Sequence, residues 1–362
     1  MIEAHFGESS PFSVGVEEEL MILDAQTLEQ VPRVDAFLGD EGFHTELFAS
    51  VVELKTGVCA SAREAADELR ALREHGASIA ERGGLRLGAA GSHPLSDPEA
   101  QEIVDLERYR TFVEYAGVSA RRQGVNGLHV HVGMTSARAC MHCLETTLPW
   151  LPVLLAISAN SPYLAGRETG LASNRAEILA ELPRSGAPPP FRAYHEWELF
   201  VERLVRLGLA SDYTLLWWDA RPHPRFGTLE VRVLDQPTSL GRTAAFVALV
   251  QALCASAFEW PPRPYDPAAR ALYQQNRWAA LRFGPTARLV HPDGDRAEGA
   301  VTLAAELVDR VRPAARSLGT ESLLDALDLH ASEGDRQLQV GRANGLQAVC
   351  ADLVTRSLAS AA

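Results

Sequence analysis

Three consecutive glutamates lie in segment 12–24, FSVGVEEELMILD, which has the pattern of a β-strand. Aliphatic side chains recur at every second position, at Val14, Val16, Leu20 and Ile22. This alternation places Glu18 on the aliphatic face, and Glu17 and Glu19 on the opposite face. Two carboxylates on one strand face lie about 6.5–7 Å apart at their Cα atoms, which suits a divalent cation bound through oxygen ligands. Taken alone, the strand is equally compatible with a solvated acidic face.

Two further segments, 50–59 and 127–134, are predicted strands with ionisable residues gathered on one face. The polar positions are Glu53 and Lys55, beside Val51, in the first segment, and His129 and His131, beside Gly133, in the second. A lone histidine on a strand is usually structural. Two in this register, in a chain with glutamates on similar strands, favour a metal or phosphate site over an exposed polar face.

Segment 217–239 contains a fourth predicted strand, entered through a turn with two prolines and a glycine. One face is predicted to carry Thr228, Glu230, Arg232 and Leu234. The other face is predicted to carry Leu229, Val231, Val233 and Asp235. Glu230 and Arg232 should therefore project together.

If these four strands share one sheet, its open face collects four carboxylates together with histidine and arginine. The predicted set is Glu17, Glu19, Glu53, Glu230, His129, His131 and Arg232. Four close carboxylates cannot all stay ionised without cations, because like charges raise one another's pKa. Magnesium would neutralise them, and it commonly shares phosphate oxygens with a nucleotide. The residues therefore predict a magnesium–nucleotide site, with loop arginines binding a carboxylate or phosphate.

The composition is that of an ordinary globular protein, with 362 residues, 46% of them hydrophobic and 22% charged. The net charge of −13 argues against nucleic acid or an anionic membrane as a partner. We see no signal peptide and no uninterrupted apolar run of membrane-spanning length. The odd number of cysteines, five, does not suggest a disulfide framework. We expect a cytoplasmic protein with small-molecule partners, for which a homodimer is one allowed assembly.

The remaining chain is predicted to be mostly helical. Helices are expected near 34–40 and over 61–82, 98–122, 136–158 and 193–209. The helix over 136–158 should be interrupted at its prolines. A short strand is expected over 85–94. The stretch 161–191 is expected to be a long loop and a candidate lid, or else an ordered surface loop with solvated arginines. After residue 240 we expect helices over 241–258, 267–283, 297–317, 321–332 and 336–358, which act as scaffold.

Several familiar nucleotide and hydrolase motifs are absent from the sequence. There is no P-loop, no strand followed by G-x-G-x-x-G, and no G-x-S-x-G elbow. Cys140 and Cys143 form a lone C-x-x-C, for which a buried helical pair is favoured over zinc. Of the adjacent Trp217 and Trp218, one is expected in the core and one as a covering residue.

Five motifs together resemble the carboxylate–amine ligase family, also called glutamate–cysteine ligase type 2. They are GVEEE at 15–19, ELKTG at 53–57, GLHVHVG at 127–133, ANSPYLAGRETGLASNR at 159–175 and RPHPRFGTLEVRVLDQPT at 221–238. The resemblance implies an α+β, glutamine-synthetase-like fold, in which a curved antiparallel sheet holds metal and ATP and helices pack outside. It implies one catalytic domain over residues 1–362, with a sheet-forming part near 12–239 and a helical part near 240–360.

The resemblance also implies roles for single residues. Glu17, Glu19, Glu53 and Glu230 are similar to magnesium ligands, with His129 as a further metal or phosphate contact. Glu53 and Arg232 are the implied catalytic residues. The implied nucleotide contacts are His129, His131, Arg225 and Arg232, and the implied substrate contacts are Arg175 and Arg167.

The implied reaction is ATP-dependent phosphorylation of a carboxylate, typically the γ-carboxylate of glutamate. An amine, typically that of cysteine, then captures the acyl phosphate. No residue of the sequence specifies a cysteine thiol pocket, and this branch of the family resembles weak or generalist ligases. Two alternatives use the same side chains: a metal-dependent phosphatase or hydrolase, and a non-catalytic nucleotide sensor.

Overall fold

The computed structural model describes residues 2–261, 266–294 and 296–358. At its centre is an antiparallel sheet with strand order β2-β3-β1-β5-β9-β8, and β4 pairs with the second half of β1. The strands of this sheet are β1 (Val14–Asp24), β2 (Phe43–Thr45), β3 (Val51–Lys55), β4 (Leu85–Gly88), β5 (Gly127–Gly133), β8 (Ala220–His223) and β9 (Thr228–Asp235). Two small hairpins stand apart: β6 (Tyr163–Leu164) with β7 (Arg167–Glu168), and β10 (Arg288–Val290) with β11 (Ala297–Gly299).

Helices account for most of the remaining structure. The α-helices are α1 (Ala62–Arg82), α2 (Glu107–Ala116), α3 (Val118–Arg121), α4 (Ala137–Thr147), α5 (Leu151–Ser158), α6 (Asn174–Ala180), α7 (Tyr194–Arg206), α8 (Leu240–Ser256), α9 (Ala269–Phe283), α10 (Ala300–Ser317), α11 (Glu333–Asn344) and α12 (Leu346–Leu358). Short 3-10 turns are η1 (Val34–Ala36), η2 (Pro98–Ala100), η3 (Leu148–Trp150), η4 (Tyr213–Leu215), η5 (Pro224–Phe226), η6 (Gly284–Thr286) and η7 (Glu321–Ala326).

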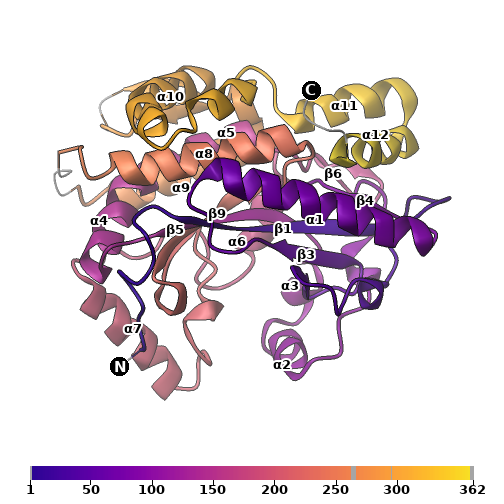
Figure 1. Ribbon diagram of the computed structural model, residues 1–362, viewed down its shortest axis with the longest axis horizontal. Helices are drawn as coiled ribbons and strands as arrows, with labels where there is room; N and C mark the ends of the chain where they lie inside the picture. Colours follow the sequence, from indigo (N-terminus) through magenta and orange to yellow (C-terminus); the bar gives the residue numbers. More distant parts are fainter. Residues whose placement is uncertain (1, 262–265, 295, 359–362) are drawn as a thin grey trace.

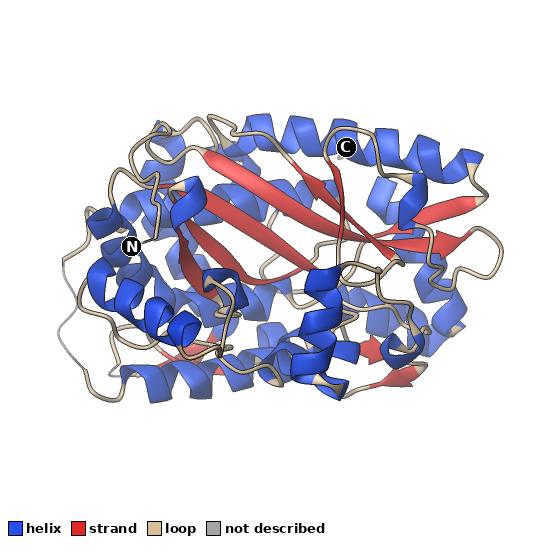
Figure 2. Ribbon diagram, turned by 90° about the horizontal axis from the view of Figure 1, so that it is seen from below, coloured by secondary structure: helices blue, strands red, loops and turns tan. Residues whose placement is uncertain are grey.

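One face of the sheet packs on helices. α1 and α8 lie across the strands, with α5, α9 and α10 near them or beyond them (Figure 1). Leu128, Val130 and Val231 of the sheet share one hydrophobic core with Phe246 of α8 and Leu303 of α10. The opposite face is open across its middle, where the strands are visible from below (Figure 2). The predicted α+β class, with a mainly antiparallel sheet and outer helices, is confirmed.

A β-bulge changes the predicted faces of β9. The register against β5 shifts between Leu128 and Val130, so Leu128 pairs with Leu234 whereas Val130 pairs with Val231. Because paired residues share a face, Leu234 joins the helix-covered core and Asp235 turns to the polar side. The prediction that Leu234 lies beside Glu230, with Asp235 opposite, was therefore wrong.

The predicted helix over 98–122 is wrong in its first part, whereas the stretch from residue 107 is largely helical. Residues 98–100 form only η2, and the chain then runs extended along the sheet edge, where Val104 N donates to Leu47 O at 2.9 Å. α2 begins at Glu107, and Gly117, with φ 58°, separates it from α3. Two features override the helical pattern. The chain pairs with the edge segment, and a glycine adopts the left-handed region.

The stretch 161–191 is not one long loop. It contains the β6–β7 hairpin and α6, and Ser161, Ser173 and Arg175 are buried. Asp235 anchors it, since both Ser161 Oγ and Ser173 Oγ donate to this carboxylate at 2.7 Å. The first half of the predicted lid is therefore fixed to the sheet.

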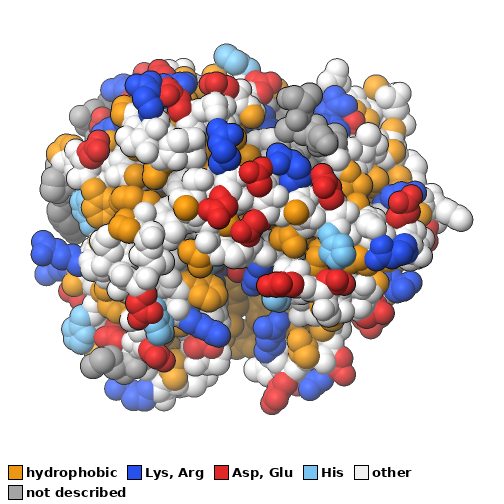
Figure 3. All heavy atoms as spheres, in the orientation of Figure 1, with side chains coloured by type: hydrophobic (Ala, Val, Ile, Leu, Met, Phe, Trp, Pro, Cys, Tyr) orange, Lys and Arg blue, Asp and Glu red, His pale blue; other side chains and the backbone are white. Residues whose placement is uncertain are grey.

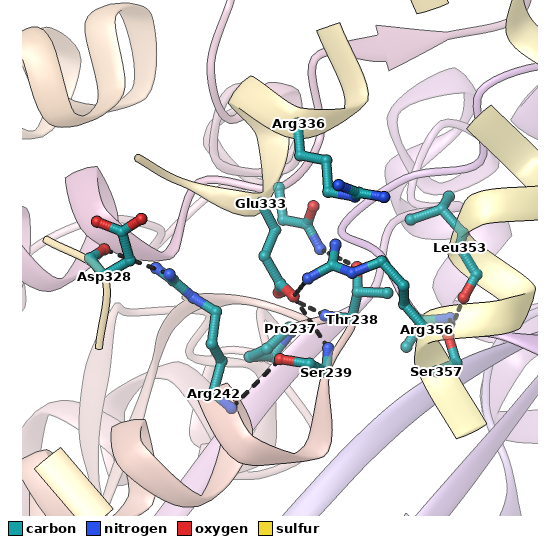
Figure 4. A network of polar contacts seen from close by, with 12 residues as sticks. Pro237, Thr238, Ser239, Arg242, Asp328, Glu333, Arg336, Leu353, Arg356 and Ser357 are labelled. Atoms are coloured by element: carbon teal, nitrogen blue, oxygen red, sulfur yellow. Dashed lines mark hydrogen bonds and ion pairs between the residues drawn. The ribbon is translucent and has the colours of Figure 1, made fainter. Parts of the chain in front are cut away.

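The C-terminal helices depart from prediction at their ends. Residues 297–299 form β11, only Glu321–Ala326 of 321–332 is helical, and Gly345, with φ 84°, breaks 336–358 into two helices. A polar network ties them to the sheet (Figure 4). Glu333 accepts from the backbone N–H groups of Thr238 at 2.6 Å and Ser239 at 3.0 Å, where β9 passes into α8. These helices thus support the end of β9. Residues 359–360 of the expected helical part lie outside the described residues.

The helical stretch 137–158 is long and apolar enough by composition to cross a membrane, with mean hydropathy 1.3, but 83% of its apolar window is buried inside the molecule. It carries Cys140 and Cys143, which are buried and free, as are the chain's other cysteines. Trp218 is buried and Trp217 is half-buried, as predicted. The helical stretch 137–158 is thus a core element of this fold.

Candidate active site

The register of the sheet brings the predicted polar residues onto one face. Glu19 lies opposite Glu53, and Glu17 lies opposite Lys55 on one side and His129 on the other. His131 in turn lies opposite Glu230. The molecule is hollowed below this part of the sheet, between the parts that carry α7 and α2, and acidic and basic side chains line the hollow (Figure 3). Glu18 instead points into the helix-covered side, as its position in the alternation predicted.

A first trio of possible metal ligands consists of Glu17, His131 and Glu230, whose ligand atoms all lie within 4.8 Å of one another. His131 Nδ1 is 2.9 Å from Thr228 Oγ1, while its Nε2 is buried without a hydrogen-bond partner and lies 3.9 Å from Glu17 Oε1. Such an unpaired ring nitrogen beside a carboxylate is suited to a metal ion or phosphate.

Neighbouring cations and imidazole groups already compensate the carboxylates of the first trio. Burial alone would raise the pKa of Glu230, but Arg221 and Arg232 outweigh it and hold the pKa well below its usual value. Arg221 Nε lies 2.6 Å from Glu230 Oε2, and Arg232 contacts Oε1. Burial is likewise outweighed at Glu17, where His129, His131 and Lys55 lower the pKa. Both carboxylates are therefore anionic and ready to ligate.

A second trio consists of Glu19, Glu46 and Glu53, again with ligand atoms within 4.8 Å. Burial, then the neighbouring Glu46, raises the pKa of Glu19 to about 8. Burial and the other carboxylates also raise the pKa of Glu53 well above its usual value, and burial raises that of Glu46. Three crowded carboxyl groups with raised pKa values are suited to a divalent cation, which would replace their protons.

Glu46 was missed by sequence reasoning. It follows β2, a strand of only three residues in which His44 pairs with Glu53. The only signal for Glu46 was the alternation of Phe43 and Thr45 with His44 and Glu46. This alternation is too short to distinguish a strand from a loop.

His129 and Arg175 lie between and behind the two trios. His129 Nδ1 is 3.2 Å from Glu17 Oε2 and its Nε2 is 3.9 Å from Glu19 Oε1. Burial first, and then Arg232, lowers the pKa of His129 to about 3, so its imidazole is neutral. Arg175 crosses over Gly127, where a Cβ would overlap its guanidinium, and donates to Arg232 O at 3.0 Å. Its Nη1 is buried without a hydrogen-bond partner.

Two predicted residues are not brought to the trios. Arg225 is exposed on η5, the turn between β8 and β9. Arg167 is exposed on the β6–β7 hairpin, whose next residue, Glu168, binds Arg342 of α11. Neither arginine contacts a trio carboxylate among the described residues.

Metal binding should strengthen with pH. An acid whose pKa is raised on folding binds more protons when folded than when unfolded, so metal-free stability falls as pH rises above the unfolded pKa. For Glu19 the window runs from its ordinary value, 4.5, to about 8. A cation replaces these protons, so the rise in melting temperature on adding Mg²⁺ should grow from about pH 5 to about pH 8. Thermal melts with and without Mg²⁺ across this range test this; a rise that is independent of pH would contradict it.

Comparison with known proteins identifies the family. The model of glutamate–cysteine ligase family 2 matches residues 13–347. A Rubrobacter xylanophilus protein, provisionally named glutamate–cysteine ligase 2-3, is 43% identical over 94% of this chain and 95% of its own. A Sorangium cellulosum protein, provisionally named glutamate–cysteine ligase 2, is 38% identical over 96% of both chains.

Solved structures with low sequence identity share the fold. Glutamate–cysteine ligase from Francisella tularensis, solved in complex with AMP, has a TM-score of 0.72 at 15% identity and covers 97% of this chain and 89% of its own. The bifunctional glutathione synthetase of Pasteurella multocida has a TM-score of 0.68 at 14% identity, over 96% of this chain and 52% of its own. With the family model spanning most of its length and relatives that match nearly all of it, this chain belongs to glutamate–cysteine ligase family 2.

Proposed function

We propose that this chain, an ATP-dependent ligase of the glutamate–cysteine ligase type, binds Mg–ATP on the open face of its sheet. It activates the γ-carboxylate of glutamate, or of a related acid, and joins it to the amine of cysteine or another amino compound. The observation that carries the proposal is the pair of acidic trios on adjoining strands of one face. The donor set fits: oxygen ligands predominate, one imidazole nitrogen is unpaired, and three carboxyl groups have raised pKa values.

In this proposal the protein contributes positioning and charge, and no side chain becomes covalently modified. The first trio would hold one cation and the second trio another, and His129 would contact metal or phosphate. When bound, ATP would supply the phosphoryl group and Mg²⁺ would neutralise its charge. Arg232 contacts Glu230 beside the first trio and adds fixed positive charge where the phosphoryl group passes. Arg175, whose Nη1 has no hydrogen-bond partner although it lies 4.0 Å from Asp235 Oδ1, is the candidate to bind the substrate carboxylate.

An acyl phosphate must be shielded from water until the amine arrives. Three segments from different parts of the chain meet beside the open face. Phe112 of α2 lies 5.4 Å from Trp217 between ring centroids, and Phe112 also packs on the cluster of Leu47, Phe48 and Val51 at the start of β3. Arg184 lies 5.5 Å from the Trp217 ring and donates to Tyr115 Oη at 3.3 Å. We assign the shielding role to this contact, to which the second half of the lid expected over 161–191 contributes Arg184.

A screen of amino acids in pairs tests the reaction. Purified protein with Mg–ATP should release ADP only when a carboxylate donor and an amine are both present, and mass spectrometry should find the amide. Phosphate release without the amine would favour a metal-dependent hydrolase. Magnesium-dependent ATP binding with no turnover for any pair would favour a nucleotide sensor. The proposal also places the protein in the cytoplasm with small-molecule partners.

A further inference from the structure

Lys55 is the only lysine in the chain, although Lys and Arg together number 34. It ends β3 and lies directly opposite Glu17 of β1. Its Nζ is 2.9 Å from Glu17 Oε1 and 2.8 Å from Glu53 Oε2. Glu17 belongs to the first trio and Glu53 to the second. The one ammonium group of the chain, other than its terminus, therefore bridges the two halves of the candidate site.

Lys55 also gives the second trio a direct charge contact, at Glu53. Glu19 accepts from Gly127 N, and Glu46 accepts from Leu47 N. Within the described part of the chain, Lys55 is the only side chain of fixed positive charge in salt-bridge contact with this trio. Arg221 and Arg232 contact Glu230 instead, and Arg175 and Arg232 act on Glu19 only through longer-range attraction.

The chemistry of lysine explains why arginine does not occupy this position. An ammonium is a compact point charge with three N–H donors, whereas a guanidinium is a flat fork suited to one bidentate partner. Two of the three donors of Lys55 are directed to Glu17 and Glu53. The side chain is 36% exposed, so the third donor is available on the open side of the sheet, where a phosphate would lie.

We propose that Lys55 is a cation that the protein itself supplies to the active site. It bridges the two metal-binding trios and donates its third N–H to the phosphoryl group, which is transferred in the space between the trios. The inference rests on the proposed function, because it requires a nucleotide phosphate on this face. In the absence of metal, Lys55 takes part of the charge-neutralising role of a cation. With metal and nucleotide bound, it contacts the phosphoryl oxygen.

The single lysine allows a direct test on the unmodified protein. Amine-selective acetylation, followed by peptide mass spectrometry, reports on Lys55 separately from the N-terminus. A nonhydrolysable ATP analogue with Mg²⁺ should slow acetylation of Lys55 at least about tenfold, with the N-terminal rate as the internal control. Calorimetry on the same sample measures whether the analogue binds. Binding with an unchanged Lys55 rate overturns the inference and leaves the proposed function standing. Failure to bind overturns both.

Two substitutions separate a role in the reaction from a purely structural ion pair. Lys55→Met removes the ammonium, so the nucleotide-free protein should bind Mn²⁺ at least about tenfold more tightly, because a competing cation is gone. Its kcat should fall by at least about a hundredfold, as for loss of one preorganised donor to a developing charge. Lys55→Arg keeps the charge but should recover little of kcat. Arg138→Met, which removes an exposed cation on α4, is the matched control. Unchanged or weaker Mn²⁺ binding in Lys55→Met would overturn the inference.

Discussion

Glu53→Gln should reduce ligase turnover by at least about a hundredfold while the protein stays folded. Substitutions of residues that only support a metal ligand cost about 10–100-fold, and Glu53 would ligate directly in the second trio. The fold should tolerate the change because the pKa of Glu53 is raised by burial and by Glu46, so a neutral group suits the metal-free site. ADP release at saturating Mg–ATP gives the turnover, and thermal melts without metal give the stability.

Glu41→Gln is the matched control for this prediction. Glu41 is an exposed glutamate just before β2, outside both trios. Its substitution should leave turnover and melting temperature unchanged. If Glu53→Gln keeps more than half of the wild-type turnover, the second trio does not serve the reaction.

The sequence predicted the polar face because side chains alternate strictly along a strand. That rule placed Glu17, Glu19, Glu53 and Glu230 on the polar faces of their own strands. The further assumption that these strands share one sheet is confirmed, and the structure brings the four to one face. It failed where strict alternation stops, at the bulge that moves Leu234 into the core. A bulge depends on how two strands pair, which one strand's sequence does not show.

Long-range contacts account for the other errors. Residues 98–106 were predicted helical, but pairing with the edge near Leu47 holds much of this stretch extended. Glu46 enters the site only because β2 adds to β3, a pairing that three residues cannot signal. Lys55 differs from Glu46, because a count of residue types is enough to single out the chain's one lysine. Its position between two carboxylates, however, depends on the pairing of β3 with β1.

Arg73→Met should destabilise the protein by about 3–5 kcal/mol, since it leaves a buried carboxylate unpaired. Arg73 lies on α1 with 3% of its side chain exposed, and Glu18 on β1 is fully buried. Arg73 Nε is 2.8 Å from Glu18 Oε2, and Arg73 Nη1 donates to Thr238 O and Ser357 O. The pair therefore joins α1 to the back of the strand whose other face carries Glu17 and Glu19.

Urea unfolding of matched variants tests whether loss of the Arg73–Glu18 ion pair lowers the free energy of unfolding by this amount. Arg70→Met, one turn earlier on α1, removes an arginine that is 41% exposed and pairs with Asp67, and it should cost less than about 1 kcal/mol. Replacing both partners, in Glu18→Leu with Arg73→Met, should cost less than Arg73→Met alone, because no buried charge is left without a partner. A double variant less stable than Arg73→Met would mean that Glu18 contributes mainly through the hydrogen bonds that it accepts from Gln236 and Thr243. The back of β1 would then depend on those two hydrogen bonds more than on the ion pair.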